Sequence, residues 1–318
     1  MDVIWLTVLG FLLAGWFVLD GYTLGVGMLL RRLGPEAGER RLLLAGVGPY
    51  FLAGEVWLVV FAGVLLAAFP ELEKELFTSL RPVVVVLVVC WVLRSSALWL
   101  RLRRDGAGWQ RGWERTLAGA SAGLAACWGL LLGNVAQGLP GRGAFAALTP
   151  LPLACALTLP VLLAVHGATV GAARTTGALS LRAGALAGRL ALPAAGLLGC
   201  TVLTGALTAV LREDAVSAPL PALVCALAAV AALAWARTPL AGTAHTAALP
   251  ATALAAAAPA LTVGIAAHDS LTALAAPRDA LDSLAPALLP ALALVVAVQA
   301  GVLWLFRGRA DGRSTVFF

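Results

Sequence analysis

Apolar runs of about 20 residues recur from one end of this 318-residue chain to the other. A run of that length, coiled as a helix, crosses the roughly 30 Å of hydrocarbon in a lipid bilayer. Charged residues make up 12% of the chain, against about 25% in a typical soluble domain. Because no stretch between the runs is long enough for a separate soluble domain, we predict an all-α integral membrane protein with a single membrane domain over residues 1–318.

The runs predict about nine transmembrane helices. The first contains Asp20 and follows Asp2 rather than a basic segment, so we interpret it as a retained helix and not as a cleaved signal peptide. The eighth is interrupted by Pro250 and Pro259, which transmembrane helices tolerate where neighbouring helices cover the freed backbone groups. The predicted spans are 3–30, 46–69, 83–102, 116–139, 151–173, 187–210, 219–236, 246–266 and 288–306.

Basic residues gather in alternate loops, and short loops rich in Lys and Arg face the cytoplasm. We therefore predict a plasma-membrane protein with its N-terminus outside and its C-terminus in the cytoplasm, and the loop positions explain the net charge of +6 without nucleic-acid binding. The predicted cytoplasmic cations are Arg31, Arg32, Arg40, Arg41, Arg101, Arg103, Arg104, Arg111, Arg115, Arg174, Arg182, Arg189, Arg237, Arg307, Arg309 and Arg313. The predicted outer loops carry Lys74, Arg81, Arg142, Arg212 and Arg278, with the acids Glu71, Glu73, Glu75, Glu213, Asp214, Asp269, Asp279 and Asp282.

Three ionisable residues, Asp20, Glu55 and Arg94, remain well inside the predicted spans. An unpaired charge at that depth costs at least about 2.5–3.5 kcal/mol. At about 1.5 Å per residue, all three lie roughly 12–15 Å from the cytoplasmic boundary, on three consecutive helices. We predict a polar cluster in which Arg94 compensates Asp20, Glu55 or both.

Two interpretations of this cluster stay open. It is either a structural ion pair that fixes helix packing, or a group that conducts protons or tunes a nearby buried redox centre. In the second case only Asp20 or Glu55 could carry a proton, because arginine stays protonated in proteins.

Residues that could ligate a metal or haem are few. His166 stands alone in an apolar span, where a hydrogen bond to a neighbour is the more common role, and His245 and His268 fall at span edges. We read the cysteines as small buried hydrophobes rather than disulfides or ligands.

We expect no metal site and no haem bound by this chain alone. No P-loop, zinc-protease or nucleophile-elbow motif is evident. The cysteines are Cys90, Cys127, Cys155, Cys200 and Cys225.

Several motifs lie in order over roughly residues 10–140. They are WFVLDGYTLGVG at 16–27, which contains Gly21 and Gly25, then Gly48-Pro49, Glu55-Val56-Trp57-Leu58, Phe69-Pro70, Arg94, and Leu132-Gly133-Asn134 through Gly138-Leu139-Pro140. In order and spacing this set resembles subunit II of the cytochrome bd family of quinol oxidases. Beyond residue 140 only the number of spans and the placement of loops support the resemblance.

The resemblance implies two four-helix bundles plus a peripheral ninth helix, packed against a subunit I that holds the haems and the quinol site. The bundles would cover 1–140 and 141–270, with the ninth helix and a cytoplasmic tail over 285–318. This chain would be an accessory, non-haem-binding subunit of a respiratory quinol:oxygen oxidoreductase, with the catalytic centres on the partner. Quinol is then the substrate of the complex, and membrane lipids and a bound quinone are further expected contacts.

The chain departs from the family pattern at several acids. Thr23 stands where the family usually has Asp. Residues 51–54 precede Glu55 where the family typically reads Trp-Asp-Gly-Asn, and Ser95 and Trp99 replace a Gly and an acid. These losses keep open a degenerate paralogue that serves as a membrane scaffold. A secondary transporter is the other alternative, favoured by the span number and intramembrane charges, although no pair of broken helices indicates inverted repeats.

Overall fold

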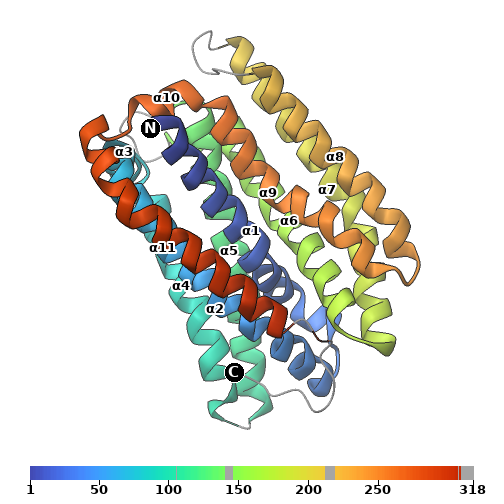
Figure 1. Ribbon diagram of the computed structural model, residues 1–318. Helices are drawn as coiled ribbons and strands as arrows, with labels where there is room; N and C mark the ends of the chain where they lie inside the picture. The colour runs from blue at the N-terminus through green and yellow to red at the C-terminus, as the bar shows by residue number, and fades with distance from the viewer. Residues whose placement is uncertain (105, 140–145, 212–218, 307, 309–318) are drawn as a thin grey trace.

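The computed structural model describes residues 1–104, 106–139, 146–211, 219–306 and 308, and these residues are almost entirely helical (Figure 1). Nine helical segments of the described chain are long and apolar enough to cross a membrane, which confirms the predicted class. In a bilayer a helix satisfies all of its own backbone hydrogen bonds, which explains this architecture. The elements are α1 (Asp2–Leu33), α2 (Ala37–Ala68), α3 (Pro70–Ser79), α4 (Arg81–Leu100), η1 (Arg101–Arg103), α5 (Ala107–Ala136), α6 (Pro150–Arg174), α7 (Gly177–Leu211), α8 (Pro219–Ala241), η2 (His245–Ala248), α9 (Leu249–Ala266), α10 (His268–Ala273) and α11 (Arg278–Leu305).

Several helices extend beyond the hydrophobic runs that predicted them. The second begins at Ala37 rather than at residue 46, because Glu36 and Glu39 form a reciprocal capping box at its start. The eighth predicted span is formed by η2 and α9. Pro250 lies in the first turn of α9, where a proline costs no hydrogen bond, and Pro259 lies inside this helix.

Two short helices replace predicted loops. The acids Glu71, Glu73 and Glu75, which the sequence predicts in an outer loop, lie on α3. Pro70 in the first turn fixes a helical φ angle, and the acids at the start of the helix complement its dipole. Both α3 and α10 lie at the end of the molecule where α1 begins (Figure 1).

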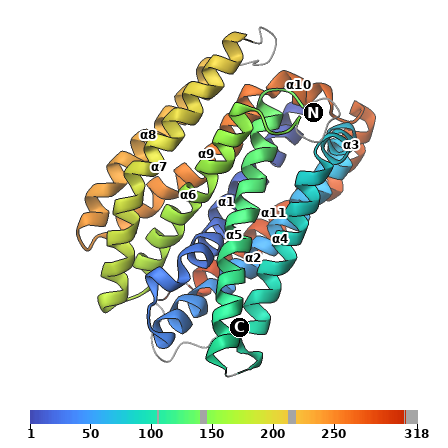
Figure 2. The same ribbon diagram turned by 180° about the vertical axis from the view of Figure 1, so that it is seen from behind.

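The long helices form two four-helix bundles and one peripheral helix, as the resemblance implied. The first bundle contains α1, α2, α4 and α5, and the second contains α6, α7, α8 and α9 (Figures 1 and 2). The two bundles share an extensive interface, because α1 packs against α6 and α9 as well as against its own bundle. The ninth long helix, α11, packs along α2 and α1 on the outside.

Two glycines let the bundles approach closely where α1 crosses α6. A Cβ atom built on Gly25 would lie 2.1 Å from the carbonyl oxygen of Leu163 and 2.7 Å from the Cα of Gly167. A Cβ on Gly167 would lie 2.5 Å from the Cα of Gly25. Small residues at helix crossings are the main packing device within membranes, since lipid provides no hydrophobic force between helices.

Arginines concentrate at one end of the molecule, which we call the arginine-rich end. It comprises the junctions α1–α2, α4–α5 and α6–α7, with Arg31, Arg32, Arg40, Arg41, Arg101, Arg103, Arg104, Arg111, Arg174 and Arg182. The predicted loop residues Pro140, Arg142, Arg212, Glu213, Asp214, Arg307, Arg309 and Arg313 lie outside the described residues.

The cysteines are free thiols, in agreement with the prediction that they form no disulfides. They are not all buried, however. Cys127 is enclosed between helices, whereas Cys200 is exposed on α7.

Candidate functional site: an intramembrane ion-pair cluster

A buried ion pair joins α1 to α4 in the middle of the first bundle. The Nη2 atom of Arg94 lies 2.5 Å from Oδ1 of Asp20. The exposed fractions of the two side chains are 0% for Arg94 and 2% for Asp20. Two opposite charges taken out of water compensate each other only when they are in direct contact, as they are here.

Thr23 completes this pair from the next turn of α1. Its hydroxyl donates to the Asp20 side chain and lies 2.9 Å from the Asp20 backbone oxygen. The same Oγ1 accepts a hydrogen bond from Nη2 of Arg94. Thr23, which replaces the usual Asp of the family motif, is therefore part of the cluster. It adds hydrogen bonds without adding charge.

Glu55 of α2 lies at the edge of the cluster. Its Oε1 is 4.0 Å from Nη1 of Arg94 and accepts a hydrogen bond of 3.0 Å from the indole of Trp91. Its side chain is 27% exposed, unlike the other two charged groups. The structure thus brings Asp20, Glu55 and Arg94 together, with Glu55 on the open side.

Residues of α2 shape the space around the pair. A Cβ atom on Gly54 would lie 2.7 Å from Cβ of Asp20, so the absence of a side chain at this position makes room for the carboxylate. The guanidinium carbon of Arg94 lies 5.1 Å from the centre of the Phe51 ring, within cation–π range. Both positions belong to the segment that departs from the family pattern.

The charges of the cluster do not balance. Two carboxylates surround one guanidinium, so one negative charge remains unless a carboxyl group holds a proton. Among the described residues, Nε and Nη1 of Arg94 donate no hydrogen bond, although Nη1 lies 4.0 Å from Oε1 of Glu55. The arrangement can therefore hold one proton or one additional polar group next to Glu55, where the cluster opens.

The other motif positions act in packing. Gly21 and Gly25 lie against α6, and Gly48 and Pro49 are buried inside α2. The ring of Trp57 occupies the position that a Cβ on Gly15 would fill, at 2.1 Å.

Sequence reasoning missed the partners of the predicted site. Trp91 lies three residues before Arg94 on α4, so helical spacing could have placed it on the same face. Thr23 stands out in the sequence only as a replaced acid, although it lies three residues after Asp20 and so on the same helix face.

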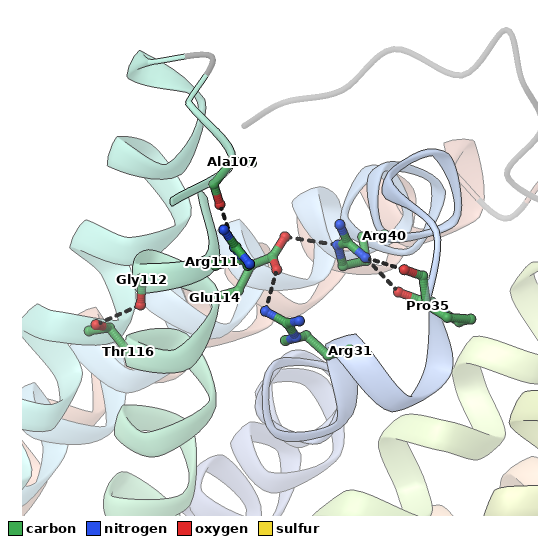
Figure 3. Close-up of polar contacts among 9 residues, drawn as sticks. Arg31, Pro35, Arg40, Ala107, Arg111, Gly112, Glu114 and Thr116 are labelled. Carbon is green, nitrogen blue, oxygen red and sulfur yellow. Dashed lines mark hydrogen bonds and ion pairs between the residues drawn. The ribbon is translucent and has the colours of Figure 1, made fainter. Parts of the chain in front are cut away.

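A second cluster lies at the arginine-rich end and was also missed. Glu114 of α5 is 2% exposed and lies between two arginines (Figure 3). Its Oε1 is 2.9 Å from Nε of Arg40, and its Oε2 is 3.7 Å from Nη1 of Arg31. Arg40 also donates to the backbone oxygens of Gly34 and Pro35. The cluster ties the α1–α2 junction to the start of α5, and it was missed because Glu114 precedes the predicted span at 116.

His166 is hydrogen-bonded on both sides of its ring. Nδ1 lies 3.1 Å from the hydroxyl of Thr252, and Nε2 lies 3.0 Å from the backbone oxygen of Val18. Since that oxygen can only accept, Nε2 carries the proton. The histidine therefore links α6 to α9 and α1, in agreement with the predicted hydrogen-bonded role.

Comparisons with known proteins point to one family. The sequence model described as cytochrome bd terminal oxidase subunit II matches residues 1–306. Cytochrome bd-I ubiquinol oxidase subunit 2 of Escherichia coli strain K12 is 29% identical over 195 residues, which are 58% of this chain and 52% of that protein. Cytochrome bd ubiquinol oxidase subunit 2 of Bacillus subtilis strain 168 is 31% identical over 137 residues, 43% of this chain and 40% of that one. The chain thus spans about half the length of the curated relatives it matches.

A solved structure shares the fold over nearly the whole chain. One chain in the structure of bd oxidase from Geobacillus thermodenitrificans superimposes with a TM-score of 0.76, at 16% sequence identity. The match covers 96% of this chain and 97% of that chain.

Proposed function

The chain belongs to the cytochrome bd terminal oxidase subunit II family, and on this basis we propose that it is the accessory, non-haem-binding subunit of a respiratory quinol:oxygen oxidoreductase. Its partner is a subunit I that holds the haems and the quinol site, and quinol is the substrate of the complex. Membrane lipids and a bound quinone are further proposed contacts.

The observation that carries the proposal is the exposed side of Glu55. Ionisable groups within a membrane normally face a bundle interior, a water-filled cavity or another protein. Glu55 is 27% exposed. Val59, one turn further along α2, is 65% exposed, and Val92, next to Trp91 on α4, is 53% exposed. A partner subunit that covers the α2–α4 face would shield Glu55 from lipid.

The engagement of His166 supports a haem-free role. Haem iron usually takes its axial ligands from His, Met or Cys side chains. Both ring nitrogens of His166 are already in hydrogen bonds, so ligation would break the link between α6, α9 and α1.

Photo-cross-linking tests where the partner lies. A benzophenone amino acid at Val59 should form covalent adducts with a second, haem-bearing polypeptide in native membranes. The matched control is Leu203 of α7, which is 71% exposed and lies on the second bundle. We expect the probe at Val59 to form adducts with a protein, and the probe at Leu203 to form adducts with lipid and with no protein. If the probe at Val59 forms no adduct with a protein, the proposed interface is wrong.

The charge imbalance supports a role for Glu55 in holding a proton next to the partner. Asp20 is engaged by Arg94 and Thr23, whereas Glu55 has one indole donor and an open side. In the assembled complex, Glu55→Gln should lower quinol-dependent oxygen uptake several-fold while leaving the haem content unchanged. Unchanged turnover would favour the alternative of a membrane scaffold, which the replaced acids also support.

We further propose that the arginine-rich end faces the cytoplasm of a cell whose plasma membrane holds the complex. The N-terminus of α1 then lies outside and the end of α11 on the cytoplasmic side. The positive-inside rule supports this orientation, because the described arginines concentrate at that end.

A further inference from the structure

A cavity of about 460 Å³ lies between the second bundle and α5 of the first, at the end opposite the arginine-rich end. Helices α5 to α9 form its walls. Along α7 the wall runs from Leu198 to Val210, which is about 18 Å at 1.5 Å per residue. On α6 it runs from Leu151, in the first turn of the helix, to Leu159.

This depth corresponds to one leaflet of a bilayer, whose hydrocarbon is roughly 15 Å thick. Arg189 is exposed on α7, nine residues before Leu198, and marks a level about 14 Å closer to the arginine-rich end. The cavity therefore occupies the leaflet at the opposite end and closes near the middle of the membrane.

The described lining residues carry no charge. Two of the lining hydroxyls, those of Thr158 and Thr201, lie 2.7 Å apart and bond to each other. The other polar groups of the wall are the hydroxyl of Thr262 and the thiol of Cys155. A quinone ring has two carbonyl groups that need donors, and this wall offers few. An unbranched hydrocarbon needs none.

The mouth of the cavity continues into the lipid-facing surface of α7 and α8. Val210 of α7 is 75% exposed and Leu220 of α8 is 69% exposed, and both residues also line the cavity. A molecule that enters from this side comes from the membrane, and the described lining residues on this side place no charged group between the cavity and the surrounding lipid.

We propose that the cavity binds one acyl chain of a membrane phospholipid, whose headgroup stays at the membrane surface near the ends of α7 and α8. The chain fills a void that would otherwise leave the surrounding side chains without contacts on one side. It thereby contacts α7 and α8 on one side and α6 and α9 on the other, since all four helices line the cavity. This inference depends on the fold and not on the proposed oxidase function.

Photo-cross-linking with a lipid probe tests the site. The probe is phosphatidylethanolamine with a diazirine in the middle of one acyl chain, added to membranes that contain the full chain in its complex. Gly205→Phe should fill the cavity, because a Cβ there lies 3.7 Å from Leu151 and points into it. Gly199→Phe on the same helix is the control, since a Cβ there meets nothing within 4 Å.

We expect adducts on the lining residues of α6 and α9 in the natural chain and in Gly199→Phe. They should fall several-fold in Gly205→Phe, because the phenyl ring takes the space of the acyl chain, while adducts on α11 stay unchanged. Equal adducts in Gly205→Phe would overturn the proposal, and so would a diazirine quinone that labels these walls when the phospholipid does not.

Thiol labelling tests the same site without a bulky substitution. Cys155 lines the cavity, and Cys200 is exposed on α7 and serves as an internal control. After replacement of Cys90, Cys127 and Cys225 by alanine, delipidation should raise N-ethylmaleimide labelling of Cys155 relative to Cys200, and added phosphatidylethanolamine should reverse the increase. A constant labelling ratio would overturn the proposal.

Discussion

Arg94 connects three helices of the first bundle through its guanidinium group. Its Nη2 serves both Asp20 and Thr23, and its Nη1 faces Glu55. Removal of the guanidinium would leave the Asp20 carboxylate buried without a countercharge. Breaking a buried pair in this way is far more destabilising than replacing the whole pair by apolar groups.

The expected effect of Arg94→Ala is a loss of about 3–5 kcal/mol of stability, the usual cost of an uncompensated buried charge. Arg94→Lys should retain part of the stability, because it keeps the charge but loses the planar fork of donors. Thermal unfolding of the detergent-purified protein measures the difference. If both variants unfold at the same temperature as the natural chain, the Arg94–Asp20 pair does not stabilise the fold.

Gly54 offers a second test at the same place. Gly54→Ala puts a methyl group 2.7 Å from Cβ of Asp20, and overpacking of this kind typically costs about 1–3 kcal/mol. Gly63→Ala on the same helix is the control, because a Cβ there meets nothing within 4 Å. A similar unfolding temperature for both variants would mean that the cluster tolerates displacement of Asp20.

The sequence contained part of this site. An intramembrane charge is conspicuous in an apolar run, and helix depth was enough to bring Asp20, Glu55 and Arg94 to one level. The roles of Thr23, Trp91 and Gly54 could not be predicted, because a threonine, tryptophan or glycine is ordinary inside a membrane helix. The contacts of these three residues depend on which faces of α1, α2 and α4 pack against each other, and tertiary packing decides this.

At the scale of helices, the number of spans followed directly from hydropathy, whereas the ends of the helices did not. The start of α2 depends on the Glu36–Glu39 capping box, and α3 depends on a proline followed by acids. Both are polar signals that a search for apolar runs passes over. The close crossing of α1 and α6 was equally hidden, because glycines are frequent throughout the chain.

This crossing carries a prediction of its own. Gly25→Ala would place Cβ 2.1 Å from a backbone oxygen of α6, so the two helices would have to separate. We expect a strong loss of folded protein, because packing at small residues holds membrane helices together. Gly10→Ala on the same helix, where a Cβ meets nothing within 4 Å, should behave like the natural chain. The yield of monodisperse protein after extraction distinguishes them, and equal yields would contradict the crossing.

At the scale of the whole molecule, the uneven distribution of arginine predicts which end faces the cytoplasm. Gly38 is exposed in the first helical turn of α2 at the arginine-rich end, and Lys74 is exposed on α3 at the other end. In intact cells, a membrane-impermeant maleimide should label Lys74→Cys and spare Gly38→Cys, and both should react after lysis. The reverse pattern would contradict the proposed orientation.

The central claim is that this chain contributes structure and a polar cluster to a complex whose haems belong to another subunit. Affinity purification of the tagged chain from its own membranes, followed by an absorption spectrum of the complex and of the separated subunits, tests this claim most directly. We expect a haem spectrum and quinol-dependent oxygen uptake in the complex, with haem absent from this chain once the partner is removed. Haem retained by the isolated chain, or a purified assembly without any haem-bearing partner, would contradict it.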